Sequence, residues 1–271
     1  MTRRVLPGFG LSLSFTLTYL TLLVFLPLLA CVAQVVSLTW SEFWSAAWTV
    51  RAQSAYALTF GASLIAAMID VVLGLLIAWV LVRYEFPFKR FFDSLIDLPF
   101  ALPTSVAGLV YSSLYVQSGW LGQFLVPLGI EAVYTRLAIV LMLVFIGLPF
   151  VVRTIQPVLE SLEGETEEAA ALLGATRLQT FLRVIFPALL PAIITGFALA
   201  FARAIGEYGS VVFVSGNIPM QTEIAPVLIV ARLEEGQYAE ATSVATILLV
   251  GSFSMLVFIN LLERWSKRHY A

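Results

Sequence analysis

Residues 167–191 read EEAAALLGATRLQTFLRVIFPALLP, a helix-forming stretch that carries charged residues at its start and in its middle. The chain around it is strongly apolar: of 271 residues, 60% are hydrophobic and 12% are charged, and the mean hydropathy is +0.96. A soluble domain of this length needs far more charge to cover its surface, and the apolar residues here come in long runs. The sequence therefore predicts an all-α membrane protein in which the quoted stretch forms a helical module between two apolar spans.

Six apolar runs are each long enough to cross the hydrocarbon core as a helix, and they lie at roughly residues 12–36, 57–82, 95–116, 137–158, 188–209 and 241–262. Such a helix needs about 20 residues to span about 30 Å. The first run, Leu11 to Val36, follows two arginines and is too long for the core of a cleaved signal peptide. We therefore expect one transmembrane domain over residues 1–271, with six spans and a long connection at residues 159–187.

Lysine and arginine predict the direction of the spans, because these residues are enriched on the cytoplasmic side. With both termini in the cytoplasm, eleven basic residues fall on the inner side and three on the outer side. The inner residues are Arg3, Arg4, Arg83, Lys89, Arg90, Arg153, Arg177, Arg183, Arg264, Lys267 and Arg268, and the outer ones are Arg51, Arg136 and Arg232. The reverse topology would invert this bias. We therefore expect a multi-pass protein whose termini and residues 159–187 are cytoplasmic.

The composition disfavours several classes of function. A net charge of −2 gives no overall basic character for binding nucleic acid. The single cysteine, Cys31, lies in an apolar run, and the single histidine, His269, is close to the C-terminus. We therefore expect no disulfide framework, no metal site and no histidine catalysis. The chain also has no G-x4-G-K-[ST] phosphate loop, so we expect no nucleotide site, no cofactor and no enzymatic activity of its own.

Residues 159–187 hold local signals for two short helices. Thr166 is a candidate N-cap, and the carboxylates that follow it suit the positive end of a helix dipole. Gly174 is a natural helix stop in the left-handed conformation. Thr176 and Gln179 form a T-x-x-Q capping box that starts a second, amphipathic helix, and Pro187 marks the start of the fifth span. These residues fit a surface for docking a partner and a simple helical connector equally well.

Two outer segments have recognisable patterns. Trp40, Trp44 and Trp48 follow the first span at intervals of four residues, which predicts a short helix anchored in the headgroup layer. Residues 210–233 are apolar but interrupted by glycine and proline, so they are too broken to span the membrane. We expect them to form an outer loop with a short helix, as an outer gate or a dock for another protein.

The spacing within the quoted stretch is similar to the EAA motif, E-A-A-x3-G-x9-I-x-L-P, of ABC importer permeases. Here Glu168-Ala169-Ala170 is followed by three residues, by Gly174, by nine residues and by residues 184–187, which read VIFP. The sequence departs from the motif by Val for Ile and Phe for Leu, both apolar exchanges. Six spans and the position of the motif between spans 4 and 5 strengthen the resemblance.

The resemblance extends over nearly the whole chain and favours the sulfate/thiosulfate permeases of that family. The stretches RRVLPGF (3–9), DLPFALPTSVAGL (97–109), PFVVRTIQPVLE (149–160), GEYGSVVFVSGNIP (206–219) and TEIAPVLIVARLEE (222–235) carry it. Molybdate permeases share a similar GEYG…GNIP region, so that stretch alone does not fix the substrate. The N-terminal stretch and residues 97–109 favour the sulfate branch.

The resemblance implies a fold, a set of partners and a coupling site. The fold is that of MetI-like permeases, with a cytoplasmic coupling helix between spans 4 and 5. The partners are a second permease subunit (CysW-like), two copies of an ABC ATPase (CysA-like) and a periplasmic sulfate-binding protein, in a bacterial inner membrane. The ATPase-coupling residues are expected to be Glu167, Glu168, Ala169, Ala170, Gly174 and Pro187.

Polar residues within the spans are candidates for a translocation pathway. Arg203 and Glu207 lie four residues apart on one helix face, and a charge at the bilayer centre costs about 2.5–3.5 kcal/mol, so neither should face lipid. They either line a path for a dianion or form a structural pair. Spans interrupted by proline, such as the third, can line a cavity. The candidate pathway residues are Arg203, Glu207, Tyr208, Ser105 and Asp70.

The sequence thus predicts the membrane subunit of an ATP-driven importer that carries sulfate, and thiosulfate with it, by alternating access. A molybdate or tungstate permease is the alternative within the same class. A stand-alone secondary anion transporter is a less favoured alternative, because we see no clear inverted repeat and it leaves the helical module unexplained. An intramembrane enzyme lacks a plausible His, Cys or metal constellation.

Overall fold

The computed structural model describes residues 8–162 and 164–270, and within that part of the chain every regular element is helical. Five helical stretches of the described residues are long and apolar enough to cross a membrane. They are Phe9–Val36, Val50–Arg83, Arg136–Ser161, Arg177–Ile205 and Tyr238–Glu263. The first consists of α1 (Phe9–Leu20), η1 (Thr21–Phe25) and α2 (Leu26–Val36), and the fourth of α11 (Arg177–Thr180), η3 (Phe181–Ile185) and α12 (Phe186–Ile205). The second is α4 (Val50–Arg83), the third is α9 (Arg136–Ser161), and the last lies in α15 (Tyr238–Tyr270).

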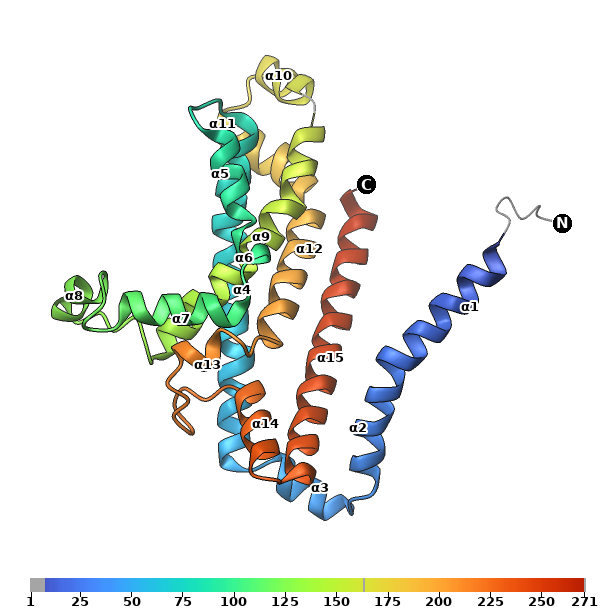
Figure 1. Cartoon of the computed structure of the whole chain (residues 1–271). Coiled ribbons are helices and arrows are strands. Elements are labelled where there is room, and N and C mark those ends of the chain that lie inside the picture. Colours follow the sequence, from blue (N-terminus) through green and yellow to red (C-terminus); the bar gives the residue numbers. More distant parts are fainter. Residues whose placement is uncertain (1–7, 163, 271) are drawn as a thin grey trace.

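The centre of the molecule is the bundle of α4, α9 and α12 (Figure 1). Small residues let these helices approach closely, as is common where helices pack within membranes. A Cβ atom added at Gly74 of α4 would lie 2.7 Å from Cγ1 of Val151 in α9, and one at Gly196 of α12 would lie 3.1 Å from the Cα of Val151. Val151 is fully buried between these two glycines. The α4, α9 and α12 backbones are therefore fixed tightly against one another.

The predicted third span, residues 95–116, is not one continuous helix. The chain forms α5 (Lys89–Ile96), α6 (Leu98–Ala101) and α7 (Thr104–Tyr115) instead. The break falls at Leu102, which has extended backbone angles (φ −89°, ψ 132°) because the proline after it disfavours the helical conformation. As a result α7 runs crosswise to the long helices in Figure 1. The expectation of six regular spans is therefore wrong at this position.

Short helices decorate the bundle at its periphery. They are α3 (Trp40–Ala47), α8 (Gly122–Leu125), η2 (Val126–Leu128), α10 (Gly164–Leu172), α13 (Val211–Val214) and α14 (Ala225–Glu234). The predicted helix after the first span is α3, whose capping box joins Thr39 and Glu42. The short helices α13 and α14 lie within the predicted outer segment of residues 210–233, on either side of irregular backbone.

The first helical stretch stands apart from the bundle on one side (Figure 1). None of the described residues from Phe9 to Val36 is buried, although α2 contacts α15. In Figure 1, α1 begins and α15 ends toward the end of the molecule that carries α10, which we call the α10 end. The opposite end carries α3 and α14 and is called the α3 end. The structure thus places the start of the first span, the end of the last one and the 159–187 module toward the same end.

Candidate functional site

The quoted stretch forms two helices joined by a sharp corner at Gly174. The amide of Gly174 donates to the carbonyl of Ala171 at 2.9 Å, and the amide of Ala175 donates to that of Ala170 at 3.0 Å. These two bonds make a Schellman motif, which requires a left-handed residue at the corner. Gly174 has φ +82°. The prediction of a left-handed glycine stop is confirmed.

The second helix begins where its capping box predicted. The Thr176 amide donates to Gln179 Oε1 at 2.8 Å, and the Gln179 amide donates to Thr176 Oγ1 at 3.3 Å. The start of the first helix was predicted less well. It begins at Gly164, so Thr166 lies inside α10 rather than at its N-cap. The helix is therefore three residues longer at its start than the sequence suggested.

Pro187 does not mark the start of a separate span. Residues 177–205 form one continuous helix, in which five residues, Phe181–Ile185, adopt a wider π turn just before the proline. A proline inside a helix lacks an amide hydrogen and clashes with the carbonyl four residues earlier, and a π turn relieves this locally. Pro27 follows a second π turn, Thr21–Phe25, in the same way. The helix that begins after the Gly174 corner and the fifth span are therefore one continuous helical stretch, Arg177–Ile205.

The outward surface of the module is exposed. No residue from Glu167 to Leu172 is buried, and the side chains of Leu172 and Leu173 at the corner are 90% and 89% exposed. Glu168 and Ala169 are exposed beside them. The sequence predicted only that this stretch is helical, and the exposure of the two leucines depends on the fold. The structure therefore presents a helix with an uncovered apolar tip and an acidic edge.

The predicted coupling residues do not all share this surface. Glu167 forms an ion pair with Arg83, the last residue of α4, while the neighbouring Glu168 is exposed. Ala170 is half-buried. Pro187 lies two turns and more beyond the corner, inside the continuous helix. Glu168, Ala169 and the corner thus form the exposed part of the predicted set.

Arg203 and Glu207 pair as predicted, with 2.5 Å between Arg203 Nη1 and Glu207 Oε2. The Glu207 side chain is 2% exposed and also accepts bonds of 2.8 Å from the amide and the hydroxyl of Ser210. A third of the Arg203 side chain remains exposed. Glu207 therefore holds the turn after α12, and Arg203 is the member of the pair that other molecules can reach.

Tyr208 and Ser105 lie close to this turn, because α7 packs on α13. A Cβ atom at Gly209 would lie 2.4 Å from Thr104 Oγ1 and 3.1 Å from Ser105 Oγ. The hydroxyl of Ser112 further along α7 donates to the carbonyl of Phe213 at 2.8 Å. Ser105 and Tyr208 are both exposed. The broken third span and the turn after the fifth span therefore meet at Gly209.

Asp70 lies elsewhere, between α4 and α9. It is 1% exposed, and its Oδ1 atom is buried without a hydrogen-bond partner among the described residues. A Cβ atom on Gly147 would lie 2.1 Å from Asp70 Oδ2, so only glycine leaves room for the carboxyl group. Asp70 is therefore enclosed by the bundle in this structure and takes no part in the ion pair of Arg203.

A polar cluster that the sequence analysis missed fixes the broken third span to the bundle. Arg153 of α9 donates to both carboxylate oxygens of Asp97, at 2.8 and 2.7 Å, and to Asp93 Oδ1 at 2.6 Å. A bidentate arginine–carboxylate pair is directional as well as strong. Arg153 was counted only for its charge, and its position opposite two aspartates of another helix depends on the fold. This cluster anchors α5 and α6 to α9.

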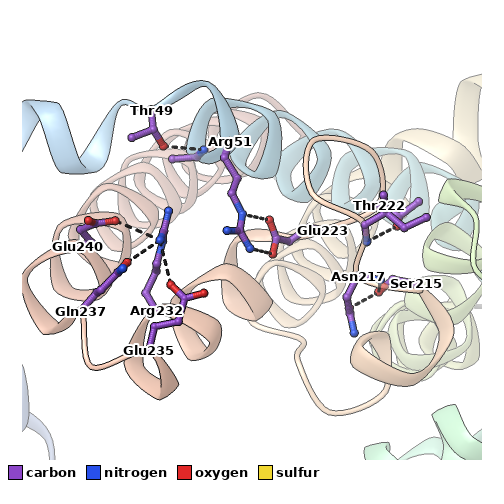
Figure 2. A network of polar contacts seen from close by, with 12 residues as sticks. Thr49, Arg51, Ser215, Asn217, Thr222, Glu223, Arg232, Glu235, Gln237 and Glu240 are labelled. Carbon is purple, nitrogen blue, oxygen red and sulfur yellow. Dashed lines mark hydrogen bonds and ion pairs between the residues drawn. The ribbon is translucent and has the colours of Figure 1, made fainter.

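The three basic residues predicted on the outer side all hold the segment between α13 and α15, and Figure 2 shows two of them, Arg51 and Arg232. Arg51, at the start of α4, donates to both oxygens of Glu223 at 2.8 and 2.7 Å. Arg232, in the last turn of α14, contacts Glu235 at 3.0 Å and Glu240 of α15 at 3.3 Å. Arg136, at the start of α9, donates to the carbonyl of Gln221 at 2.8 Å. The outer segment is thus pinned to three long helices.

The fold is that of the membrane subunits of ABC importers. A solved structure described as a bacterial ABC transporter involved in the import of the acidic polysaccharide alginate has a chain that superposes on this one with a TM-score of 0.78, at 15% sequence identity, over 95% of this chain and 96% of the other. At that identity the likeness concerns the fold alone.

Residues 70–268 match the family of binding-protein-dependent transport system inner membrane components, and the chain belongs to this family. It is 52% identical to the sulfate transport system permease protein CysT of Synechocystis sp., over 94% of this chain and 89% of the other. It is 51% identical to the protein of the same name from Synechococcus elongatus, over 95% of this chain and 93% of the other.

Proposed function

We propose that the chain is the membrane subunit of an importer that translocates sulfate, and thiosulfate with it, into the cytoplasm. The observation that carries this proposal is the identity of 51–52% with CysT proteins over nearly the whole chain, which includes the module around Gly174. The corner geometry supports it, because a capped helix with uncovered leucines at its tip is suited to a groove on another protein. ATP hydrolysis then belongs to a separate subunit.

The mechanism follows from how the exposed helix is connected. Closure of an ATPase pair moves the two α10 helices of a permease pair toward each other. Because α11, η3 and α12 form one continuous helix, displacement of the Gly174 corner is passed along 29 residues to the turn that holds Arg203 and Glu207. The spans then alternate between inward-open and outward-open arrangements. A rigid connection transmits such motion better than a flexible loop.

The proposed partners are a second permease (CysW-like), two ATPase subunits (CysA-like) and a periplasmic sulfate-binding protein. The lysine and arginine bias supports a cytoplasmic location for the α10 end and both termini, within an inner membrane. The pinned outer segment of residues 210–233 is then the outer gate or the dock for the binding protein. Pinning by Arg51, Arg136 and Arg232 supports this role, because a dock that stays fixed can convey contact to the spans.

Arg203, Tyr208 and Ser105 are proposed to line part of the pathway, with Arg203 supplying positive potential to a passing dianion. Glu207 positions Arg203 through their ion pair and is itself buried. A pathway site has to bind weakly, because tight binding would trap sulfate. Selection of sulfate therefore rests mainly with the binding protein. Asp70 is enclosed between α4 and α9 and is left out of this proposed lining.

Uptake of labelled anion into proteoliposomes that hold the chain with its co-expressed neighbours tests the function. We expect ATP-dependent uptake of sulfate, with excess molybdate a poor competitor. Uptake of molybdate or tungstate in preference to sulfate would assign the chain to that branch of the family. Uptake that persists without ATP and without an ATPase subunit would contradict the importer and favour a secondary transporter.

A further inference from the structure

We propose that Arg83 and Glu167 form a tether that sets the orientation of α10 and carries its movement into α4 as well as α12. The proposal rests on the proposed function, because it concerns the helix that meets the ATPase. It makes Glu167 an internal positioning residue and leaves Glu168 as the carboxylate that faces the partner.

The described side chains of α10, from Glu167 onward, are little enclosed by the rest of the molecule. No residue from Glu167 to Leu172 is buried, and the helix otherwise packs on α11, to which the corner joins it. A Cβ atom at Gly174 would have no atom within 4 Å, so the corner itself is not enclosed by neighbours. The ion pair between Glu167 and Arg83 joins α10 directly to the long helix α4. Because the described side chains from Glu167 to Leu172 are not enclosed by neighbours, this ion pair bears strongly on the orientation of α10.

The Arg83 side chain is positioned for this contact by its own helix. Arg83 is the last residue of α4, where a positive charge suits the negative end of the helix dipole. Its guanidinium lies over the ring of Trp79, 5.6 Å from the ring centroid, in a cation–π arrangement. Only 23% of the Arg83 side chain is exposed. The guanidinium is therefore held toward α10 by its own helix.

The ion pair between Arg83 and Glu167 is connected to the fifth span through Trp79. Trp79 packs edge-on against Phe181 of η3, with 5.7 Å between the ring centroids. Glu167, Arg83, Trp79 and Phe181 thus form an unbroken series of contacts from α10 through α4 to η3. The tether fastens the start of α10 to this series, while the corner fastens its end. A push on α10 is then shared between α4 and α12.

The two adjacent glutamates cannot serve the same surface, because successive residues on a helix point about 100° apart. Glu167 points toward Arg83, with 32% of its side chain exposed, and Glu168 is exposed. The two carboxylates of the EE pair therefore have separate roles. Loss of Glu168 should weaken binding of the ATPase. Loss of Glu167 should leave that binding intact but weaken the coupling of sulfate uptake to ATP hydrolysis.

The test uses the complete complex in proteoliposomes and measures sulfate taken up per ATP hydrolysed. We expect Arg83→Ala and Glu167→Gln each to lower this ratio about two- to five-fold, the range for one partly exposed ion pair that biases a two-state orientation. ATPase co-purification should stay at the parental level. The charge swap, Arg83→Glu with Glu167→Arg, gives up the cation–π contact with Trp79 but should still raise the ratio above that of either charge reversal made alone, which a purely steric role would not allow.

Glu85→Gln is the matched control. It removes a different ion pair at the same end of α4, that of Glu85 with Lys89, where the Glu85 side chain is 89% exposed. We expect its ratio to equal that of the parent. If Arg83→Ala fails to assemble, Glu167→Gln decides the question, because it changes a residue on an unburied stretch of helix.

A parental ratio in assembled Glu167→Gln complexes would overturn the tether, and so would a charge swap no better than either charge reversal made alone. These outcomes differ from failure of the proposed function. In that case the parental chain itself would neither co-purify with an ATPase nor couple ATP hydrolysis to sulfate uptake.

Discussion

Replacing Gly174 by valine should uncouple transport from ATP hydrolysis. Gly174 has φ +82°, and a Cβ atom there would meet nothing within 4 Å, so the substitution creates no clash. The whole effect comes from the backbone. A residue with a Cβ atom in the left-handed region costs roughly 1–2 kcal/mol, and a β-branched one lies toward the upper end of the range of strained backbones, about 1–3 kcal/mol. A cost of about 2–3 kcal/mol lowers the population of the native corner about 30- to 160-fold relative to other backbone conformations.

The assay is sulfate uptake per ATP hydrolysed in proteoliposomes. We expect Gly174→Val to lower this ratio at least about five-fold while ATP hydrolysis continues, because the ATPase retains its chemistry and loses a correctly oriented α10. Gly174→Asn should have a smaller effect, since asparagine tolerates the left-handed conformation better than valine does.

Gly236→Val is the matched control for this prediction. Gly236 also has positive φ, +74°, and also has nothing within 4 Å of a Cβ atom, but it lies between α14 and α15 at the α3 end. It carries the same backbone cost without touching the corner of α10. If assembled Gly174→Val couples as the parent does, or if Gly236→Val uncouples equally, the reasoning about the corner is refuted.

Three further predictions follow from other parts of the structure. Gly108→Ala should destabilise the complex by about 1–3 kcal/mol and so lower its melting temperature, because the added Cβ atom would lie 2.4 Å from the Ser210 carbonyl oxygen. Gly10→Ala is the control: a Cβ atom there has nothing within 4 Å, so this variant should melt like the parent. Arg203→Ala should lower sulfate uptake and cost about 1–3 kcal/mol of stability, because it leaves the 2%-exposed Glu207 side chain without its partner. Adding Glu207→Gln should restore the stability but not the uptake. Recovery of uptake in the double variant would remove Arg203 from the pathway. Hydrogen bonds from the Thr39 side chain and amide lower the pKa of Glu42, so the ionised carboxylate stabilises α3 at neutral pH. This stabilisation is lost as the pH falls below 4.5, the ordinary pKa of a glutamate. Tryptophan fluorescence should show a transition in that range that is absent from Glu42→Gln, and identical titrations would contradict the capping role.

The parts of the fold that sequence predicted well depend on local rules. The left-handed Gly174 and the Thr176 capping box need only their own neighbours in the chain, and both are present in the structure. Four of the predicted spans also correspond to single continuous helices with shifted ends: residues 57–82, 137–158, 188–209 and 241–262. The first, 12–36, is continuous through a π turn.

The parts that sequence missed depend on long-range packing. The apolar content of residues 95–116 suggested a span, but the local effect of Pro103 on Leu102 outweighed it, and α7 instead packs on α13. Arg83 and Glu167 are 84 residues apart, and Arg153 and Asp97 are 56 apart. No periodicity links such residues, so their pairing could be found only after the helices had been placed.

The buried carboxyl group of Asp70 has a consequence for how the chain is made. The stretch from Phe9 to Val36 buries no residue and can settle in lipid as soon as it leaves the ribosome. The next helix carries Asp70 into the bilayer before Gly147, which accommodates it, has been synthesised. Insertion of a charged carboxylate at the centre of that helix costs about 2.5–3.5 kcal/mol, against a large apolar gain from its other residues. The order of synthesis thus requires α4 to enter the bilayer on its own apolar residues, before the glycine that makes room for Asp70 exists.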